Sequence, residues 1–434
     1  MKTNKLLTII FLVILAFIFS ACATKDAGYT AKHDYSDDIF SSGEVGGGDF
    51  GYKIEPSGFG ADDEYMGYGE YESEPSTADF GYSENGNKYR SGQLTVKAYN
   101  DNENWDYYRD LIQKDFVSYQ NNFKLACNRI KLSFKGLSNV RVTLYKDNDE
   151  VDYIAYSDAL GNAYLFTNNP KEEYKVRIEY SKNDNSIDEI KTVKNNDEID
   201  LSIENSLNNI IQLMFVIDTT GSMGDEIRYL QSEIADVIKR VKEDNNQITI
   251  YLSLLFYRDH GDEYVTRYFD FTTDIDLQIE NLSKQYAQGG GDFEEAVDEA
   301  LDLASKQQWF MNSSTNILVH VADAPAHNSL VNNWFNAVDK LASENVKIIN
   351  VASSGIDKLT EYFFRNECFR TNGYYCYLTN HSGIGGGHID ATLPDEPSVE
   401  FLNDCLVRLI NGIHTGDMKA PVDYQQKQPE QQAD

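Results

Sequence analysis

A segment that could bind a hard cation follows an apolar run near the middle of the chain. Residues 210–217 are almost entirely apolar, and Asp218-Thr219-Thr220-Gly221-Ser222-Met223 comes directly after them. A tight loop of this spacing can aim the carboxylate of Asp218 and the hydroxyls of Thr220 and Ser222 at one point. Oxygen ligands of this kind suit Mg²⁺, Mn²⁺ or Ca²⁺. Because few of these ligands are anionic, the cation keeps residual positive charge and an open coordination position for a carboxylate of a protein partner.

An aspartate before small residues is also a common helix cap, so the string alone is a weak signal. Here the loop stands after a buried strand pattern and before an amphipathic helix pattern. Open α/β sheets bind their ligands at the carboxyl ends of strands, which is where this loop lies. The position therefore favours a metal loop over a plain cap.

Two later segments add candidate ligands. The apolar run Ile317 to Ala322 ends in Asp323, and Gly289-Gly290-Gly291-Asp292 opens a helical pattern. Asp292 either ligates the cation, directly or through water, or caps the helix. A second or third carboxylate would make the cation less electrophilic and would weaken the capture of a partner's carboxylate. The candidate metal ligands are Asp218, Thr220, Ser222, Asp292 and Asp323.

The loop at 218–222 resembles the Asp-x-Ser/Thr-x-Ser loop of the metal-ion-dependent adhesion site of von Willebrand factor A domains. The strings 256–262, 289–295 and 322–327 are similar to those of one branch, found in hemicentin and in domains linked to α-kinases. Glu294 departs from the usual proline of that branch. The resemblance covers residues 210–413 and implies a Rossmann-like fold, a bound divalent cation (Mg²⁺ first, then Mn²⁺ or Ca²⁺) and binding of a protein partner.

The string Tyr257-Arg258-Asp259-His260 ends the strand predicted beside the metal strand. Arg258, Asp259 and His260 are therefore candidates for a partner-binding rim around the cation. The alternative is an internal pair of Arg258 with an aspartate that fixes the loop.

The elements that must position these residues alternate between strands and helices from residue 208 onward. The fold class that this pattern predicts is α/β, a doubly wound, mostly parallel sheet. The expected strands are 210–217, 248–257, 265–271, 317–321, 346–351 and 374–378, and the expected helices are 225–241, 294–305, 334–342, 359–371 and 399–413.

The preceding region alternates polar and apolar residues in short runs, which predicts a small β-sandwich. The expected strands are 130–134, 140–145, 153–156, 163–166, 174–180 and 187–193, after a helix over 105–119. Residues 137–144 and 158–165 are similar to carboxypeptidase-regulatory, prealbumin-like modules. We expect this module to act as a spacer.

The chain begins like an exported protein. Lys2 and Lys5 precede an apolar run too short to span a membrane, and the run ends in Ser20-Ala21-Cys22. This ending resembles a bacterial lipobox, although Phe19 replaces the usual Leu. The resemblance implies lipidation at Cys22, a lipid bilayer as partner through the acyl anchor, and a place on the cell membrane or outer membrane. The alternative is an ordinary cleaved signal.

Composition places the remaining boundaries. Residues 23–92 are rich in Gly, Tyr and acidic residues without a hydrophobic period, which predicts a disordered tether, and the Gln-rich tail is predicted to be disordered as well. The expected parts are a signal peptide (1–22), the tether (23–92), the sandwich (93–204), the von Willebrand factor A domain (205–415) and the tail (416–434).

Charge and cysteine content exclude several functions. The formal net charge of −32 argues against nucleic acid as a partner, because phosphate binding needs Lys and Arg. No Cys-x-x-Cys pair is present, which argues against a zinc-thiolate site; Cys368 and Cys376 either form a disulfide or stay free thiols. No nucleophile–base pairing is evident, so we expect no enzyme activity.

Three hypotheses for the function follow. The first is a surface lipoprotein that binds a protein partner through the cation. The second is a structural or regulatory lipoprotein whose metal only stabilises the fold, and the third is an accessory subunit of a membrane enzyme complex.

Overall fold

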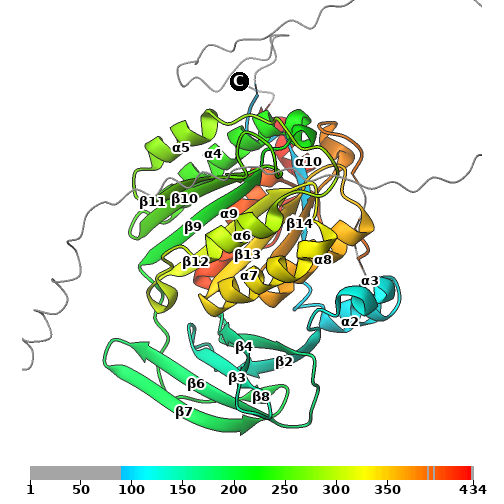
Figure 1. Cartoon of the computed structure of the whole chain (residues 1–434). Helices are drawn as coiled ribbons and strands as arrows, with labels where there is room; N and C mark the ends of the chain where they lie inside the picture. Colours follow the sequence, from blue (N-terminus) through cyan, green and yellow to red (C-terminus); the bar gives the residue numbers. More distant parts are fainter. Residues whose placement is uncertain (1–88, 389–390, 394–395, 432–434) are drawn as a thin grey trace, which may run out of the picture. The chain divides into compact units, whose positions relative to one another are not determined.

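The computed structural model describes residues 89–388, 391–393 and 396–431 (Figure 1). The predicted signal peptide with Cys22, and the predicted tether up to residue 88, lie outside these residues. Within the described part, no helix is both long and apolar enough to cross a membrane.

An eight-stranded sheet forms the centre of the structure, in the order β11-β10-β9-β12-β13-β14-β1-β15 (Figure 1). The five central strands, β10, β9, β12, β13 and β14, are parallel to one another. At the edges, β11 is antiparallel to β10, and β1 is antiparallel to both β14 and β15. The strands are β1 (Thr95–Tyr99), β9 (Ile210–Asp218), β10 (Thr249–Tyr257), β11 (Thr266–Thr272), β12 (Thr315–Ala322), β13 (Val346–Ala352), β14 (Tyr374–Leu378) and β15 (Glu400–Phe401). The predicted doubly wound, mostly parallel sheet is confirmed.

Helices cover both faces of this sheet, which explains why β9 is apolar along its whole length. Ile211, Leu213, Phe215 and Ile217 pack with α4, α5 and α9, while Met214 and Val216 belong to the core shared with α6, α7 and α8. The helices are α4 (Ile227–Asp244), α5 (Ile275–Ser283), α6 (Val297–Ser305), α7 (Val331–Ser343), α8 (Lys358–Arg370) and α9 (Leu402–Thr415). Four short 3-10 helices are η1 (Gly221–Asp225), η2 (Met311–Ser313), η3 (Asn328–Leu330) and η4 (Asn380–Ser382).

The boundary predicted at residue 93 for the sandwich is wrong for its first strand. β1 pairs with β14 and β15 in the large sheet, with Val96 opposite Leu378. Leu94 and Val96 are buried in the core on the α4 side, and Glu233 of α4 accepts hydrogen bonds from the backbone N–H groups of residues 92–94. Five residues with no period of their own cannot indicate which sheet they will join.

The predicted sandwich region contains two small sheets that share buried side chains. The sheet orders are β5-β2-β8 and β4-β3-β6-β7, from β2 (Asn128–Ser133), β3 (Arg141–Tyr145), β4 (Val151–Tyr156), β5 (Asn162–Thr167), β6 (Tyr174–Lys182), β7 (Asn185–Val193) and β8 (Asp197–Glu198). The single helix predicted over 105–119 is two helices, α2 (Trp105–Gln113) and α3 (Val117–Phe123). Strands β4 and β5 contact the end of α8, where the Tyr153 hydroxyl donates to the carbonyl of Arg370 at 2.7 Å.

The predicted disordered tail contains a helix, α10 (Tyr424–Gln431). The Tyr424 N–H donates to the carbonyl of Val399 at 2.8 Å, and its ring contacts Phe401 and His381. Lys427 forms an ion pair of 2.8 Å with Asp404. These contacts hold a segment whose Gln-rich composition gives no hydrophobic period.

The four cysteines in the described part are free thiols: Cys127, Cys368, Cys376 and Cys405. The disulfide considered between Cys368 and Cys376 is therefore not formed. Instead, the Cys368 thiol donates to the carbonyl of Tyr374 at 3.1 Å.

Candidate metal centre

The candidate site lies where the chain changes direction across the sheet. After β9 the chain continues to β10 and β11 on one side, and then returns to β12, β13 and β14 on the other. The carboxyl ends of β9 and β12 therefore meet at a switch point, the usual ligand position in such sheets. Asp218 is the last residue of β9, and Asp323 directly follows β12.

The loop after β9 is folded around the carboxylate of Asp218. Its Oδ1 accepts hydrogen bonds from the backbone N–H of Thr220 at 2.8 Å and from the Thr220 hydroxyl at 2.7 Å. The Thr220 and Ser222 hydroxyls are 3.2 Å apart, and Ser222 is near enough to Asp323 to lower the pKa of its carboxyl. Asp218 and Thr220 are fully buried, whereas Ser222 is exposed. The structure thus brings together Asp218, Thr220, Ser222 and Asp323, with Ser222 on the side open to solvent.

Three buried carboxylate oxygens at this switch point have no hydrogen-bond partner among the described residues. They are Oδ2 of Asp218, Oδ1 of Asp323 and Oε2 of Glu295. Buried polar atoms are almost always partnered, because an unpartnered one costs free energy. A cation or a proton can satisfy each of these oxygens, and among the described residues the three do not form a group whose ligand atoms all lie within 4.8 Å of one another.

Burial and mutual repulsion keep these carboxyls protonated more readily than usual. Burial, then the charge of Asp323, raises the pKa of Asp218 to about 7, and burial raises that of Asp323 to about 6. Burial, then the charge of Asp218, raises the pKa of Glu295 to about 9. A divalent cation would reverse these shifts by stabilising the ionised forms. The all-oxygen donor set fits Mg²⁺, Mn²⁺ or Ca²⁺.

Glu295 was missed by sequence reasoning, although it stands in the glycine-containing string. Its backbone N–H donates to the carbonyl of Pro325 at 2.9 Å, which ties it to the loop after β12. Gly290, at φ +75°, allows this approach, because a Cβ there would lie 2.9 Å from Glu295 Oε1. A glycine at position 290 therefore leaves room for the carboxylate of Glu295.

A second glutamate without any sequence signal also borders the site. Glu226 is buried after η1, and its charge acts on Asp323. The backbone N–H of Ser354 donates to its carboxylate at 3.2 Å, and His388 Nε2 lies 3.3 Å from it. The glycine-rich segment 381–388 therefore packs its last histidine against the site.

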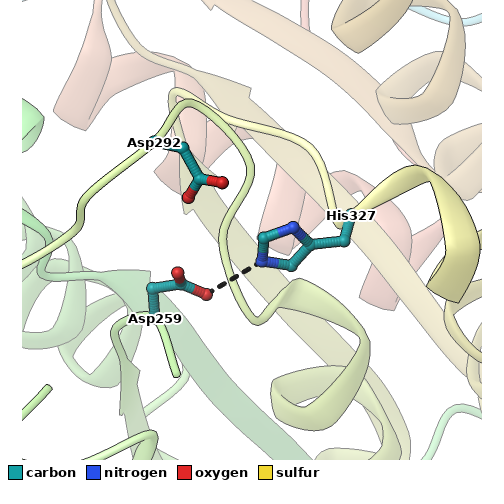
Figure 2. Close-up of side chains that lie close together, drawn as sticks. All are labelled: Asp259, Asp292 and His327. Carbon is teal, nitrogen blue, oxygen red and sulfur yellow. Dashed lines mark hydrogen bonds and ion pairs between the residues drawn. The ribbon is translucent and has the colours of Figure 1, made fainter. Parts of the chain in front are cut away.

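Asp292 joins a different cluster from the one predicted. One ligand atom each of Asp259, Asp292 and His327 lies within 4.8 Å of the others, and Figure 2 shows the three side chains converging. His327 Nε2 is hydrogen-bonded to Asp259 Oδ1 at 3.1 Å. Burial lowers the pKa of His327, but the hydrogen bond and charge of Asp259, with Asp292 and Glu294, raise it overall. These two carboxylates and one imidazole form a second candidate cation site, and sequence reasoning missed His327 although it ends the third string.

The predicted rim is wrong for Arg258, whose side chain is 1% exposed. Its Nε donates to the carbonyl of Thr219 at 3.1 Å and its Nη2 to the carbonyl of Tyr286 at 3.0 Å. The guanidinium also lies over the rings of Tyr264 and Tyr286, 4.5 and 5.1 Å from their centroids. Arg258 is an internal clamp between the metal loop and the glycine loop, because its long side chain turns inward to these carbonyls.

The other two rim candidates differ in exposure. Asp259 is buried and faces His327, whereas the side chain of His260 is 45% exposed. The His260 ring stacks near that of His327, at 6.2 Å between centroids. Of the three predicted rim residues, His260 is the one that reaches the surface.

A series of buried polar side chains leads from Tyr257, next to the site, into the core. Tyr257 lies opposite Asp218 in the register of β10 and β9, and its hydroxyl pairs with His320 Nε2 at 3.1 Å. His320 Nδ1 lies 3.0 Å from Glu367 Oε2, and Trp334 Nε1 donates to the other oxygen of Glu367 at 2.5 Å. His320 is thus a core histidine with partners on both nitrogens.

The family model described as von Willebrand factor A domain matches residues 212–388. This part of the chain is therefore a von Willebrand factor A domain, as its loop strings indicate. The resemblance of the preceding region to carboxypeptidase-regulatory modules receives no support from the comparisons.

Two named proteins share sequence with this region. The α-protein kinase vwkA of Dictyostelium discoideum is 27% identical over 179 residues, which are 41% of this chain and 28% of that protein. A protein named as an ariadne-like RING finger protein, R811 of Acanthamoeba polyphaga mimivirus, is 27% identical over 153 residues, which are 35% of this chain and 14% of that protein. The chain thus spans less than a third of the length of either relative.

Among solved structures, the conserved hypothetical protein BatB from Bacteroides thetaiotaomicron matches 38% of this chain and 89% of that chain. The sequence identity is 12% and the TM-score is 0.30.

Proposed function

We propose that the von Willebrand factor A domain holds a divalent cation at Asp218, Thr220, Ser222 and Asp323 and uses it to bind a protein partner. One observation carries this proposal: buried carboxylate oxygens of Asp218 and Asp323, with no hydrogen-bond partner among the described residues, lie at a switch point whose outermost candidate ligand, Ser222, is exposed. A cation there would satisfy the buried oxygens and still be reachable from solvent. We propose binding rather than catalysis as the role.

The number of carboxylates limits how the partner binds. Asp218 and Asp323 together balance the two charges of the cation when both are ionised. Glu295, whose pKa lies near 9, stays protonated at neutral pH until the cation displaces its proton. A partner's acidic side chain therefore meets a less electrophilic cation than one held by a single aspartate, and a neutral oxygen of the partner can compete with it.

The cluster of Asp259, Asp292 and His327 provides a second set of candidate ligands. A set with one imidazole suits Mn²⁺ or Zn²⁺ better than Mg²⁺. We propose Mg²⁺, Mn²⁺ or Ca²⁺ at the Asp218 site and treat the histidine cluster as a separate position. Variants of the two sites distinguish them.

The cellular setting of the proposal comes from the sequence. We propose a cell-envelope lipoprotein anchored at Cys22 to the cell membrane or outer membrane, with the tether and the two small sheets as spacer. The support is the apolar run that ends in Ser20-Ala21-Cys22.

A second candidate function is that the cation only stabilises the fold. The burial of Asp218, Thr220 and Asp323 favours this reading, because a cation enclosed by buried ligands does not need a partner. The two functions differ in whether the binding of a partner requires the cation.

The test combines stability with partner capture. Mg²⁺, Mn²⁺ or Ca²⁺ should raise the thermal midpoint of the folded protein, because a ligand of the native state stabilises it by mass action. The Asp218→Ala/Ser222→Ala double variant should lose this shift, while His327→Ala should keep it. A pull-down from cell-envelope extract with cation or with EDTA then separates the functions. Partner binding that needs both the cation and Asp218/Ser222 supports the proposal. A cation shift with EDTA-insensitive binding, or with no captured partner, favours the stabilising role.

A further inference from the structure

A cavity of about 860 Å³ lies away from the metal centre, between the small sheets and the end of the large sheet. Its walls come from α2, β2 and β5 on one side and from β14 and α9 on the other. This volume is in the usual range for a small-molecule site. The proposed function uses none of its residues.

The carboxylates of this cavity are already engaged by the protein. Asp158 accepts from the backbone N–H groups of Leu160 and Asn162 through Oδ1 and from the Asn372 amide through Oδ2. Glu103 Oε1 accepts from the Tyr374 hydroxyl at 3.1 Å. Asp106 is paired with Arg109 at 3.2 Å.

Among the described residues, three of the basic side chains that line the cavity are not paired with groups of opposite charge. Arg129, Lys131 and Lys347 all line the cavity, and in the part of the chain that the structure describes none of them has a carboxylate within ion-pair distance. Lys347 Nζ has the neutral amide oxygen of Asn345 at 3.2 Å, and burial lowers the pKa of this lysine. Unpaired cations gathered in one cavity are unexpected in a chain of net charge −32. The arrangement leaves positive charge open to an anion.

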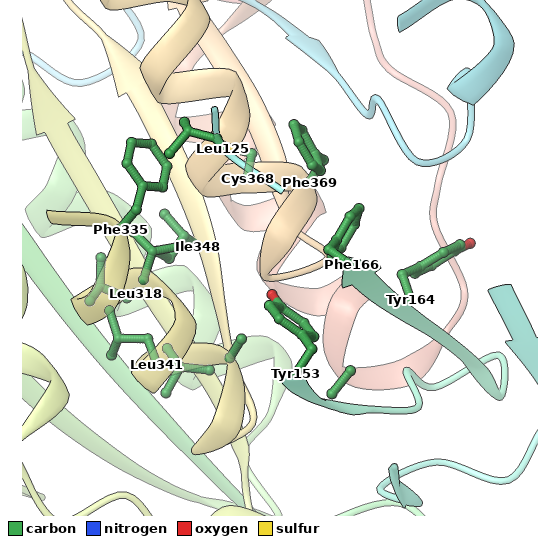
Figure 3. Close-up of a cluster of buried hydrophobic side chains, with 14 of the residues drawn as sticks. Leu125, Tyr153, Tyr164, Phe166, Leu318, Phe335, Leu341, Ile348, Cys368 and Phe369 are labelled. Carbon is green, nitrogen blue, oxygen red and sulfur yellow. The ribbon is translucent and has the colours of Figure 1, made fainter. Parts of the chain in front are cut away.

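Arg129 is held in place without an acid. Its guanidinium carbon lies 4.5 Å from the centroid of the Trp105 ring and 5.0 Å from that of Tyr164, and its Nη1 donates to the carbonyl of Asn102 at 2.6 Å. Its Nε is buried and has no acceptor among the residues that the structure describes. Figure 3 shows Tyr164 at the edge of the apolar cluster, with its hydroxyl turned away from Phe166. Aromatic faces thus fix a guanidinium whose remaining donors can bind a carboxylate or phosphate.

The rest of the wall is rich in neutral amides, which both donate and accept hydrogen bonds. Asn162, Asn195, Asn196 and Asn372 line the cavity beside the cations; Asn195 Oδ1 already accepts from the Lys131 N–H and the Asn372 amide already donates to Asp158, so these two offer their other amide atom. Amides of this kind match hydroxyl groups, which also donate and accept. We propose that this cavity binds an acidic sugar, with Arg129 and Lys131 on the acid group and the asparagine amides on the hydroxyls. The acid is a carboxylate in a uronic acid and a phosphate in a sugar phosphate.

Calorimetric titration of the purified protein with four probes tests the proposal. Trigalacturonate and glucose 6-phosphate represent the two acids, and maltotriose and glucose are their neutral counterparts. Binding of at least one acidic probe, about tenfold or more tighter than its neutral counterpart, is expected from a charge-assisted contact. The preferred acidic probe identifies the source of the anion. Equal binding of acidic and neutral sugars, or no binding of any probe at millimolar concentration, overturns the proposal.

Two variants and one control variant test whether the acidic probe binds in this cavity. Arg129→Met should lower the affinity for the acidic probe about tenfold or more, and Arg177→Met, which removes an exposed arginine on β6, should not. Because Arg129→Met also removes two ring contacts, Lys131→Gln provides a variant that should fold normally. Lys131→Gln should lower the affinity severalfold with an unchanged thermal midpoint. Unchanged affinity in Lys131→Gln and in a folded Arg129→Met protein would place the sugar elsewhere and refute the assignment.

Discussion

Replacing Arg258 by Met separates the internal clamp from the partner-binding rim. The variant removes the Arg258 donors to the buried carbonyl of Thr219 and to the partly buried carbonyl of Tyr286. The Thr219 carbonyl keeps the Gln288 N–H at 3.0 Å and Tyr286 is 43% exposed, so the loss is that of two hydrogen bonds from a charged donor, about 1.5–3 kcal/mol each at most. The cation–π contacts with Tyr264 and Tyr286 add about 0.5–2 kcal/mol each. We count nothing for Glu263, because its carboxylate is more than half exposed.

We therefore expect Arg258→Met to lower the free energy of unfolding by about 3–5 kcal/mol, after allowing for water that reaches one carbonyl. Urea denaturation followed by tryptophan fluorescence and circular dichroism measures this loss. Cation affinity should fall as well, because Thr219 precedes the ligand Thr220 and Tyr286 precedes the glycine loop.

Arg267→Met is the matched control. Arg267 also lies over the ring of Tyr264, at 3.9 Å, but it is 32% exposed and donates to the side chain of Gln285. Its replacement should cost about 1 kcal/mol or less. A variant of Arg258 that is as stable as that of Arg267, yet loses partner binding, would refute the clamp and restore the rim.

Three further predictions test other parts of the molecule. The pKa of Asp218 in the folded protein, near 7, lies above its usual 3.8. The cation-free protein should therefore lose stability relative to Asp218→Asn as pH rises from about 4 to 7, and cation affinity should rise over the same range. Thermal midpoints and cation titrations from pH 5 to 8 check both signs. A flat cation affinity across this range would contradict the raised pKa. A truncated chain that begins at residue 205 lacks β1 and exposes the edge of β14, so it should melt well below a chain that begins at residue 89, or aggregate. Cys22→Ser should block acyl labelling and membrane fractionation; identical fractionation of wild type and variant would dismiss the anchor.

The candidate ligands show how far the sequence leads. The period of the apolar residues places Asp218 and Asp323 at strand ends, and parallel strands bring their carboxyl ends to one edge, so the pairing of these residues was predictable. Asp292 was not, because its place depends on the path of the glycine loop, which turns its carboxylate toward Asp259 and His327. The direction of a side chain on a loop is set by contacts that have no period along the chain.

Segments with few residues were equally hard to place. β1 and α10 are short, and their contacts are with residues far away in the sequence, such as Leu378 for β1 and Val399 for α10. Local propensity cannot select between distant partners, so the prediction placed residues 95–99 in the sandwich region with no strand expected there, and it left α10 as a tail.

The sequence by itself determined the doubly wound sheet, the loop of Asp218, Thr220 and Ser222, and the family of the domain, because hydrophobic period and loop spacing are local properties. Only the tertiary structure decided that Arg258 turns inward, that Glu295 adds an unpartnered carboxylate oxygen to the site, and that Arg129 lines a cavity without an ion-pair partner among the described residues. Each of these depends on which groups from distant segments meet in space, and on whether water or protein then surrounds their charge.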